Sequence, residues 1–124
     1  MVERNELTDE QVDRIFHALS QATRRDMLRR TLAAEQSVSE LAREYDMSFA
    51  AVHKHVTVLE QAELVVKRAE GRERRIRANP DMIARARTLL AQYEAMWRAR
   101  IGRLDDLLAD DSTPDPSKPN STSP

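Results

Sequence analysis

The amino-acid sequence predicts a mainly α-helical protein with one β-hairpin, and three observations support this fold class. Apolar residues recur every three or four positions in several segments between residues 8 and 62, the spacing of amphipathic helices. A β-branched segment that begins at Leu64 returns through a turn containing Gly71. A last apolar stripe then runs from Met82 to Leu108 with a helical period of about 3.6 residues.

The first helix is expected over residues 8–19, with Thr8 as its N-cap and acidic side chains in its first turn. A break at residues 20–23 leads into a second helix. Arg24 and Arg25 stand at its start, where the helix dipole disfavours cations. A buried ion pair or a phosphate contact would offset this cost, and a plain surface role is equally consistent. The predicted buried face is Met27, Leu28, Leu32 and Ala33, and the predicted outer side is Arg24, Arg25, Arg29 and Arg30.

Two further helices are separated by a tight turn. The shorter is expected over Val38–Tyr45 with Ser37 or Ser39 as its cap, and Asp46 and Met47 form the turn. Ser48 caps the longer helix, which runs to about Ala62. This arrangement is typical of a helix-turn-helix. The inner stripe of the longer helix is predicted to be Val52, His55, Val56 and Leu59, with His55 hydrogen-bonded inside the domain rather than binding metal.

A hairpin follows directly and is expected to form a wing. Its first strand begins at Leu64–Val66, Glu70-Gly71-Arg72 is the turn, and Arg74–Ala78 is the second strand. Because alternate strand residues face opposite sides, Arg72 and Arg74 should point one way and Arg75 and Arg77 the other. The sequence therefore predicts a winged helix-turn-helix.

The final helix is expected to start near Pro80 and to extend nearly 30 residues, or about 40 Å. A domain of about 100 residues cannot cover that length, so the remaining apolar stripe needs a partner. We expect a homodimer formed through the first and last helices. The predicted dimer interface is Val12, Ile15, Phe16, Leu89, Leu90, Tyr93, Met96, Trp97, Ile101 and Leu104.

Charge is unevenly distributed along the chain. The net charge is −1, yet residues 64–79 carry six cations and two glutamates, whereas the first 13 residues carry five acids and one arginine. A local basic patch attracts phosphates even where the whole chain is near neutral. The hairpin is therefore the strongest electrostatic indication of nucleic-acid binding.

The run VSELAREYDMSFAAVHKHVTVLEQAELVVKR resembles the ArsR (ArsR/SmtB-like) transcriptional repressors. Its matching positions are Leu41-Ala42, Met47-Ser48, Val52, His55, Leu59 and Leu64-Val65. The upstream run ALSQATRRDMLRRTL is similar to the opening of that family through Ala18-Leu19 and Thr23-Arg24-Arg25. The resemblance covers about residues 12–108. It implies a winged helix-turn-helix dimer that binds double-stranded DNA and blocks a promoter.

The sequence departs from the family pattern at four places. Leu41-Ala42-Arg43 stands where metal sensors carry a Cys-x-Cys box, and the last helix has no histidine, so the known metal-sensing modes do not carry over. Phe49 replaces a residue that is commonly polar, and Glu63 replaces a common glycine. These changes affect base readout and turn geometry.

We expect the helix after Ser48 to enter the major groove while the hairpin contacts the backbone beside it. Phe49 or Ala51 could touch a thymine methyl group. The alternative is an amphipathic helix and a charged hairpin that only face water. For Arg72 and Arg74 we favour a contact with DNA. For Arg68 and Arg75 a contact with DNA and a side chain that only faces water are equally consistent with the sequence. The predicted DNA-binding residues are Ser48, Phe49, Ala51, His53, Lys54, Thr57, Arg68, Arg72, Arg74 and Arg75.

Several classes of function are excluded or disfavoured. The absence of cysteine excludes disulfides and thiolate metal sites. Gly71 and Gly102 are the only glycines, so no phosphate loop exists, and no catalytic set is recognisable; we expect no enzyme activity and no cofactor. No apolar run has the length of a membrane span, and the acidic N-terminus is not a signal peptide, so a cytoplasmic location is expected.

Residues 1–108 are expected to form one DNA-binding and dimerisation domain, and the Pro- and Ser-rich residues 109–124 a disordered tail. Two other functions remain open. One is a protein-interaction module that kept this fold but lost DNA binding. The other is a ligand- or metal-responsive sensor with a site at the dimer interface, for which His17, Asp105, Asp106 and the acidic N-terminus are weak candidate ligands. The sequence identifies no effector.

Overall fold

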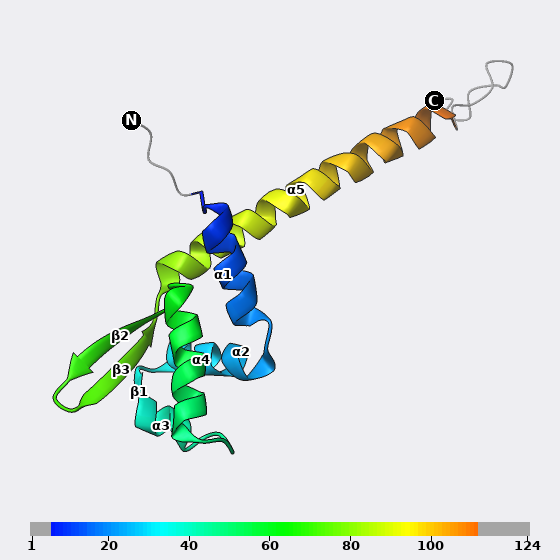
Figure 1. Ribbon diagram of the computed structural model, residues 1–124. Helices are drawn as coiled ribbons and strands as arrows, with labels where there is room; N and C mark the ends of the chain where they lie inside the picture. Colours follow the sequence, from blue (N-terminus) through cyan, green and yellow to red (C-terminus); the bar gives the residue numbers. More distant parts are fainter. Residues whose placement is uncertain (1–5, 112–124) are drawn as a thin grey trace, which may run out of the picture. The chain divides into compact units, whose positions relative to one another are not determined.

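The computed structural model describes residues 6–111, and Figure 1 shows how their elements follow one another. These residues form two compact units, one ending at Leu89 and the other beginning at Leu90. The elements are α1 (Asp9–Leu19), α2 (Ala22–Ala33), β1 (Gln36–Ser37), α3 (Val38–Ala42), α4 (Phe49–Gln61), β2 (Val65–Glu70), β3 (Glu73–Ala78) and α5 (Pro80–Asp111).

Three helices begin where side-chain oxygens cap free main-chain N–H groups. The Thr8 hydroxyl accepts from the Gln11 N–H at 3.1 Å, and the Gln11 side chain accepts from the Thr8 N–H at 2.8 Å. Ser37 forms the same reciprocal arrangement at the start of α3. The Ser48 hydroxyl accepts from the Ala51 N–H at 3.1 Å. Each cap contributes about 1 kcal/mol, and the predicted starts of these helices are confirmed, with Ser37 rather than Ser39 as the cap.

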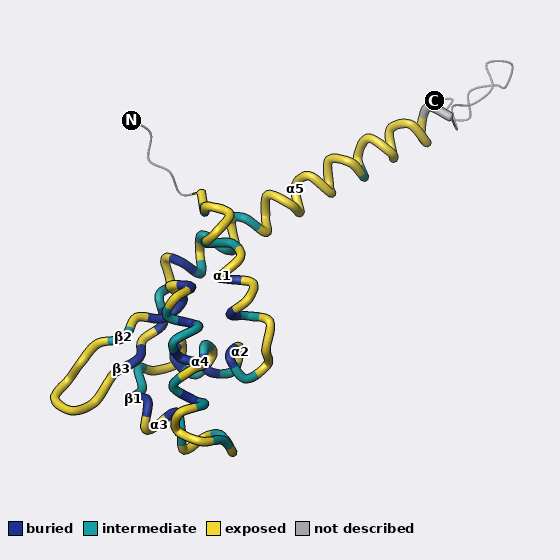
Figure 2. Tube along the Cα trace, in the orientation of Figure 1, coloured by how far each residue is buried: buried dark blue, intermediate teal, exposed yellow. Residues whose placement is uncertain are grey.

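The core of the first unit lies between the helices and the small sheet, where the dark blue segments of Figure 2 meet. Its largest fully buried side chains include Met27, Leu41, Leu59, Leu64 and Ile76. Truncating such a side chain to alanine costs about 2–5 kcal/mol. Ile15, predicted at the dimer interface, is only 3% exposed and belongs to this core, so the structure removes it from the interface.

The buried face of α2 differs from the prediction by one position. Arg24, Met27 and Thr31 are its buried residues, whereas Leu32 is 52% exposed and Ala33 is exposed. The spacing of three and four residues places Arg24 on the same stripe as Met27. The expectation that Arg24 covers the outer side is therefore wrong, because this arginine lies inside the domain.

Helix α3 is shorter than predicted and ends at Ala42 instead of Tyr45. The chain continues through tighter turns, in which the Glu44 N–H donates to the Leu41 carbonyl at 2.9 Å and the Tyr45 N–H to the Ala42 carbonyl at 3.4 Å. Bonds across three residues are typical of a helix end that tightens. They bring the aromatic ring of Tyr45 back toward α2.

The sheet has three antiparallel strands in the order β1-β3-β2. The predicted hairpin is confirmed, with Val65 opposite Ala78 and Glu70 opposite Glu73. The two-residue strand β1 was not predicted, because a pair of polar residues carries no alternation from which a strand is recognised. In β3, Ile76 and Ala78 face the core, and Figure 2 shows that exposure increases toward the tip of the hairpin.

The end of α4 depends on an unusual backbone conformation. Glu63 has a φ of 61°, and the Leu64 N–H donates to the Leu59 carbonyl at 3.0 Å. This left-handed residue closes the helix and turns the chain into β2, a role for which glycine is favoured. Glu63 adopts the geometry in spite of its side chain.

Helix α5 begins at Pro80, as predicted, and continues to Asp111, three residues beyond the boundary expected at Leu108. The rest of the predicted disordered tail, residues 112–124, lies outside the described residues. Within residues 6–111, none of the helices combines the length and the apolar character that crossing a bilayer requires.

Candidate nucleic-acid interface

The outer face of α4 carries most of the predicted groove contacts. Phe49 is 54% exposed at the first position of the helix, and Lys54 is exposed one turn later. The ring of Phe49 stacks on that of His53 at a centroid distance of 6.4 Å and an interplanar angle of 28°. Ser48 lies beside them as the cap. The structure therefore brings these predicted residues together at one end of the helix.

Two of the predicted α4 residues are less available. Ala51 is half-buried beside the core, whereas its neighbour Ala50, which the sequence prediction omitted, is exposed. The Thr57 hydroxyl donates to the His53 carbonyl at 3.0 Å, so its donor is used within the helix. The outer stripe thus consists of the exposed residues 49, 50 and 54 and the half-buried residue 53, as the helical period requires.

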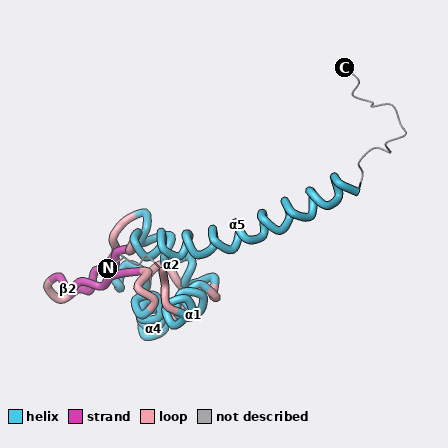
Figure 3. The backbone as a smooth tube through the Cα atoms, turned by 90° about the horizontal axis from the view of Figure 1, so that it is seen from above, coloured by secondary structure: helices cyan, strands magenta, loops and turns pink. Residues whose placement is uncertain are grey.

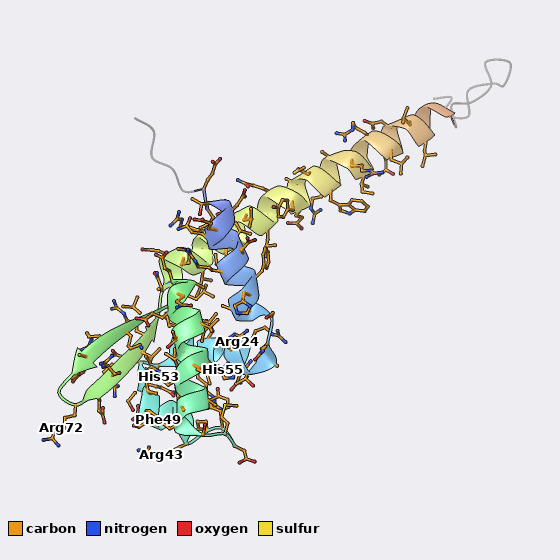
Figure 4. The ribbon with its side chains drawn as sticks, viewed as in Figure 1. Arg24, Arg43, Phe49, His53, His55 and Arg72 are labelled. Atoms are coloured by element: carbon orange, nitrogen blue, oxygen red, sulfur yellow. The ribbon has the colours of Figure 1, made fainter. Side chains whose placement is uncertain are left out.

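The hairpin presents two cations at its tip that lack an acidic partner within residues 6–111. Arg72 lies in the turn and Arg74 at the start of β3, and both are exposed. Figure 3 shows the hairpin extending beyond the helices of the first unit, and in Figure 4 the Arg72 side chain points away from the body of that unit. Both guanidinium groups are therefore open to an external anion.

Arg68 and Arg75 differ, because carboxylates hold them on the other side of the hairpin. Arg68 lies 2.8 Å from Glu35 and 3.1 Å from Glu70, and the hydrogen bond to Glu35 raises the pKa of Arg68. Arg75 lies 3.6 Å from both Glu40 and Glu73. Exposed pairs of this kind contribute little stability individually, but together they connect the hairpin to the segment that carries β1 and α3.

A hollow of about 390 Å³ lies between the start of α4 and the hairpin. Its walls include the rings of Phe49 and His53 on one side and the cationic Lys67, Arg72 and Arg74 on the other. Lys67 also lies 3.3 Å from Glu60. Sequence reasoning missed two further cations, Lys67, which lines this hollow, and Arg43, which Figure 4 shows on the same side of the unit as Phe49. The helix was predicted to continue to Tyr45, which placed Arg43 in its interior. In the structure Arg43 is the C-cap of α3.

A buried arginine positions α4 against the two preceding helices. The Arg24 side chain is 3% exposed and donates from Nε to the Ala18 carbonyl and from Nη2 to the His17 carbonyl, both at 2.8 Å. Its Nη1 lies 3.1 Å from Nδ1 of His55. Since arginine only donates, His55 accepts through Nδ1 and carries its proton on Nε2. Burial, and then the Arg24 cation, lower the pKa of His55. The expectation that His55 hydrogen-bonds inside the domain is confirmed (Figure 4).

A second network holds the turn that precedes α4. The Tyr45 hydroxyl donates to Asp26 at 2.6 Å, and Arg30 donates to the same carboxylate at 2.9 Å. The guanidinium of Arg30 also lies 5.6 Å from the centre of the Tyr45 ring. These bonds lower the pKa of Asp26, and burial raises the pKa of Tyr45 to about 12. The turn is thereby fixed to α2, which sets the start of α4.

The part of the chain that the structure describes contains no group of three or more His, Asp or Glu side chains placed to bind a metal ion. The predicted weak ligands belong to different units, with His17 in the first and Asp105 and Asp106 in the second. The site described above is instead a surface of aromatic rings, small side chains, cations and one glutamate, Glu73. Its chemistry suits recognition of a polyanion with apolar groups.

Comparison with known proteins agrees with this geometry. A family model described as a helix-turn-helix domain matches residues 19–68. HTH-type transcriptional regulator Rv2034 of Mycobacterium tuberculosis is 34% identical over 100 residues, which cover 81% of this chain and 94% of the relative. The structure of an ArsR-like transcriptional regulator from Rhodococcus sp. RHA1 is 31% identical with a TM-score of 0.71, covering 79% of this chain and 92% of that one.

A more distant solution structure shows the same fold. It is the homodimeric winged helix-turn-helix DNA-binding domain of a Mycobacterium bovis protein, 21% identical with a TM-score of 0.56. The match covers 92% of this chain and 94% of that one. The arrangement of helices and hairpin seen here is therefore the winged helix-turn-helix arrangement.

Proposed function

The chain belongs to the ArsR family of winged helix-turn-helix transcriptional regulators, and from that premise we propose that it acts as a homodimeric repressor on a palindromic operator. A regulator of this family binds DNA. The finer proposal assigns α4 to the major groove and the hairpin tip to the neighbouring phosphates. Repression follows because a dimer covering promoter DNA excludes the polymerase from it.

The observation that carries the proposal is the hollow between α4 and the hairpin. The rings of Phe49 and His53 line its α4 side. Arg72 and Arg74 line its other side together with Glu73, and neither arginine forms an ion pair with a carboxylate among the described residues. Helix N-terminal residues reach base edges in the groove, and cations beside them neutralise phosphates. We assign Arg68 and Arg75 to bracing the hairpin, since Glu35 and Glu40 already engage them.

The DNA proposal is tested by fluorescence anisotropy on a duplex at several salt concentrations. Wild-type affinity should fall steeply with salt, with a slope of about 0.9 per neutralised phosphate. The double variant Arg72→Ala/Arg74→Ala should reduce that slope by about 2, whereas Arg68→Ala should leave it unchanged. If binding shows no salt dependence at all, the protein-interaction alternative replaces the DNA proposal. Equal slopes for all three proteins would contradict the assignment of Arg72 and Arg74 to phosphate contacts.

The dimer proposal rests on the second unit, where α5 exposes large apolar side chains along one stripe. Leu90, Tyr93, Met96, Trp97, Leu104, Leu107 and Leu108 are each 50–67% exposed. An uninterrupted apolar stripe of this length marks an interaction surface. A second copy would present the same stripe and form a two-fold symmetric contact. The dimer would then carry two α4 helices, which would bind the two halves of a palindromic site with centres about one DNA turn apart. In the first unit, Phe16 on α1 is 47% exposed, and we propose it as a separate contact of the dimer.

A pair of variants tests the dimer. Trp97→Glu places a charge in the stripe and should shift the mass measured by light scattering from two chains to one. Ala99→Glu adds the same charge about 200° away around the helix and should leave the dimer intact. A wild-type protein that is monomeric at micromolar concentration would contradict the proposal, as would a Trp97→Glu protein that remains dimeric.

The repressor role is tested by transcription in vitro from a promoter that contains a DNA fragment selected by the protein. Added wild-type protein should reduce the transcript, and the Arg72→Ala/Arg74→Ala variant should require a much higher concentration to do so. An increase of transcript with wild-type protein would show activation instead.

A further inference from the structure

Phe49 is an exposed aromatic residue at the point where α4 would meet DNA. It is the first residue of the helix, directly after the Ser48 cap, and 54% of its surface is exposed. Its neighbour Ala50 is small and exposed and adds little bulk beside the ring.

The ring packs against a second ring of the same helix. It stacks on His53, one turn further along α4, at a centroid distance of 6.4 Å and an interplanar angle of 28°. Both rings line the hollow whose opposite wall contains Lys67, Arg72, Glu73 and Arg74. An aromatic side chain has only two torsions to order, so it loses little conformational entropy when it is covered, which favours its use as a contact. The two rings thus form an aromatic platform edged by three cations and one glutamate.

The chemistry of the major groove limits what such a platform can select. Base edges there present hydrogen-bond donors and acceptors, except for the C5 methyl group of thymine. A phenyl ring pressed against a polar edge would deprive it of water and offer no hydrogen bond in return. We propose that Phe49 reads the 5-methyl group of a pyrimidine, so that each operator half-site has thymine or 5-methylcytosine at one fixed position. This inference rests on the proposed DNA-binding function and adds the chemical group that is selected.

The test removes only that methyl group. A duplex selected by the wild-type protein from genomic fragments is synthesised with deoxyuridine in place of thymidine, one position at a time. We expect one symmetry-related pair of positions at which uracil weakens binding about fourfold per half-site, the effect of one buried methyl group, and about 15-fold when both are changed. At that pair, a 5-methylcytosine·guanine pair should bind about fourfold more tightly per half-site than cytosine·guanine.

Variants of Phe49 connect the effect to this ring. Phe49→Ala should bind thymine and uracil duplexes equally while keeping the salt dependence, and Phe49→Leu should keep part of the preference. Because the substituted position is exposed, circular dichroism should show that both variants fold like the wild type. If the wild type binds no selected fragment, the proposed function fails and this inference fails with it. If it binds but no uracil position weakens binding, or if Phe49→Ala retains the wild-type preference, the methyl inference alone is overturned.

Discussion

Replacing Arg24 with methionine tests whether a buried cation holds α1, α2 and α4 together. The guanidinium donates to the Ala18 and His17 carbonyls at 2.8 Å and contacts Nδ1 of His55 at 3.1 Å. No carboxylate pairs with it among the described residues; it is stabilised by carbonyls at the C-terminal end of α1, where the helix dipole favours a cation. Methionine preserves much of the length and removes every one of these bonds.

The magnitude follows from the bonds lost and the charge no longer buried. Hydrogen bonds from a charged donor contribute about 1.5 kcal/mol or more each, so three of them amount to about 4.5 kcal/mol. Relief from desolvating the guanidinium, whose hydrogen bonds are made, returns about 2 kcal/mol of this, the low end of the range for a buried polar group. We therefore expect Arg24→Met to lower the free energy of unfolding by about 2–3 kcal/mol, which corresponds to a fall in Tm of about 10 °C for a unit of this size.

Thermal and urea unfolding followed by circular dichroism measure this change, at one protein concentration because dimerisation would contribute to stability. Arg25→Met is the matched control, since Arg25 is exposed and makes one bond, to the Leu19 carbonyl at 2.7 Å. Its cost should stay below about 1 kcal/mol. An Arg24→Met protein as stable as the wild type, or more stable, would refute the reasoning that these carbonyl bonds outweigh the cost of the buried charge.

The remaining predictions concern single positions in the first unit. Burial and the Arg24 cation lower the pKa of His55, so the neutral ring should contribute its full stability above about pH 6.5 and less as the pH falls below that value. His55→Gln should flatten this decline of stability with falling pH. A variant with the same pH profile as the wild type would contradict this prediction. Glu63→Gly should raise the free energy of unfolding by about 1 kcal/mol, because glycine adopts a φ of 61° without strain. Gly71 has a φ of 62°, so Gly71→Ala should lower the free energy of unfolding by a similar amount. Tyr45→Phe should cost about 1 kcal/mol through the lost bond to Asp26, and urea midpoints check all of these.

Local sequence signals predicted most of the fold because the interactions behind them are local. Caps at Thr8 and Ser48 fix helix starts through bonds that span three residues, and Gly71 permits the turn that the hairpin requires. The register of the hairpin follows from that turn. The residues on the exposed face of α4 follow from the helical period, which is why Phe49, His53 and Lys54 were predicted together.

Other features depended on residues distant in sequence. Strand β1 exists because Gln36 and Ser37 pair with Ile76 and Arg75 of β3, and two residues alone carry no signal of that pairing. The α3 helix ended early where the chain turns back toward α2 and Tyr45 reaches Asp26. The same limit applied to Ile15, whose position in the core became evident only when its neighbours were in place.

The order of the elements, the winged helix-turn-helix class and the concentration of cations in the hairpin follow from the amino-acid sequence, because helical periods, caps and turn residues act over a few positions. The use of each arginine depends on the folded chain. Arg24 is buried, and glutamates engage Arg68 and Arg75, whereas Arg72 and Arg74 have no carboxylate partner among the described residues. A charge is neutralised by whichever groups the fold brings within a few ångströms, and composition does not specify those neighbours.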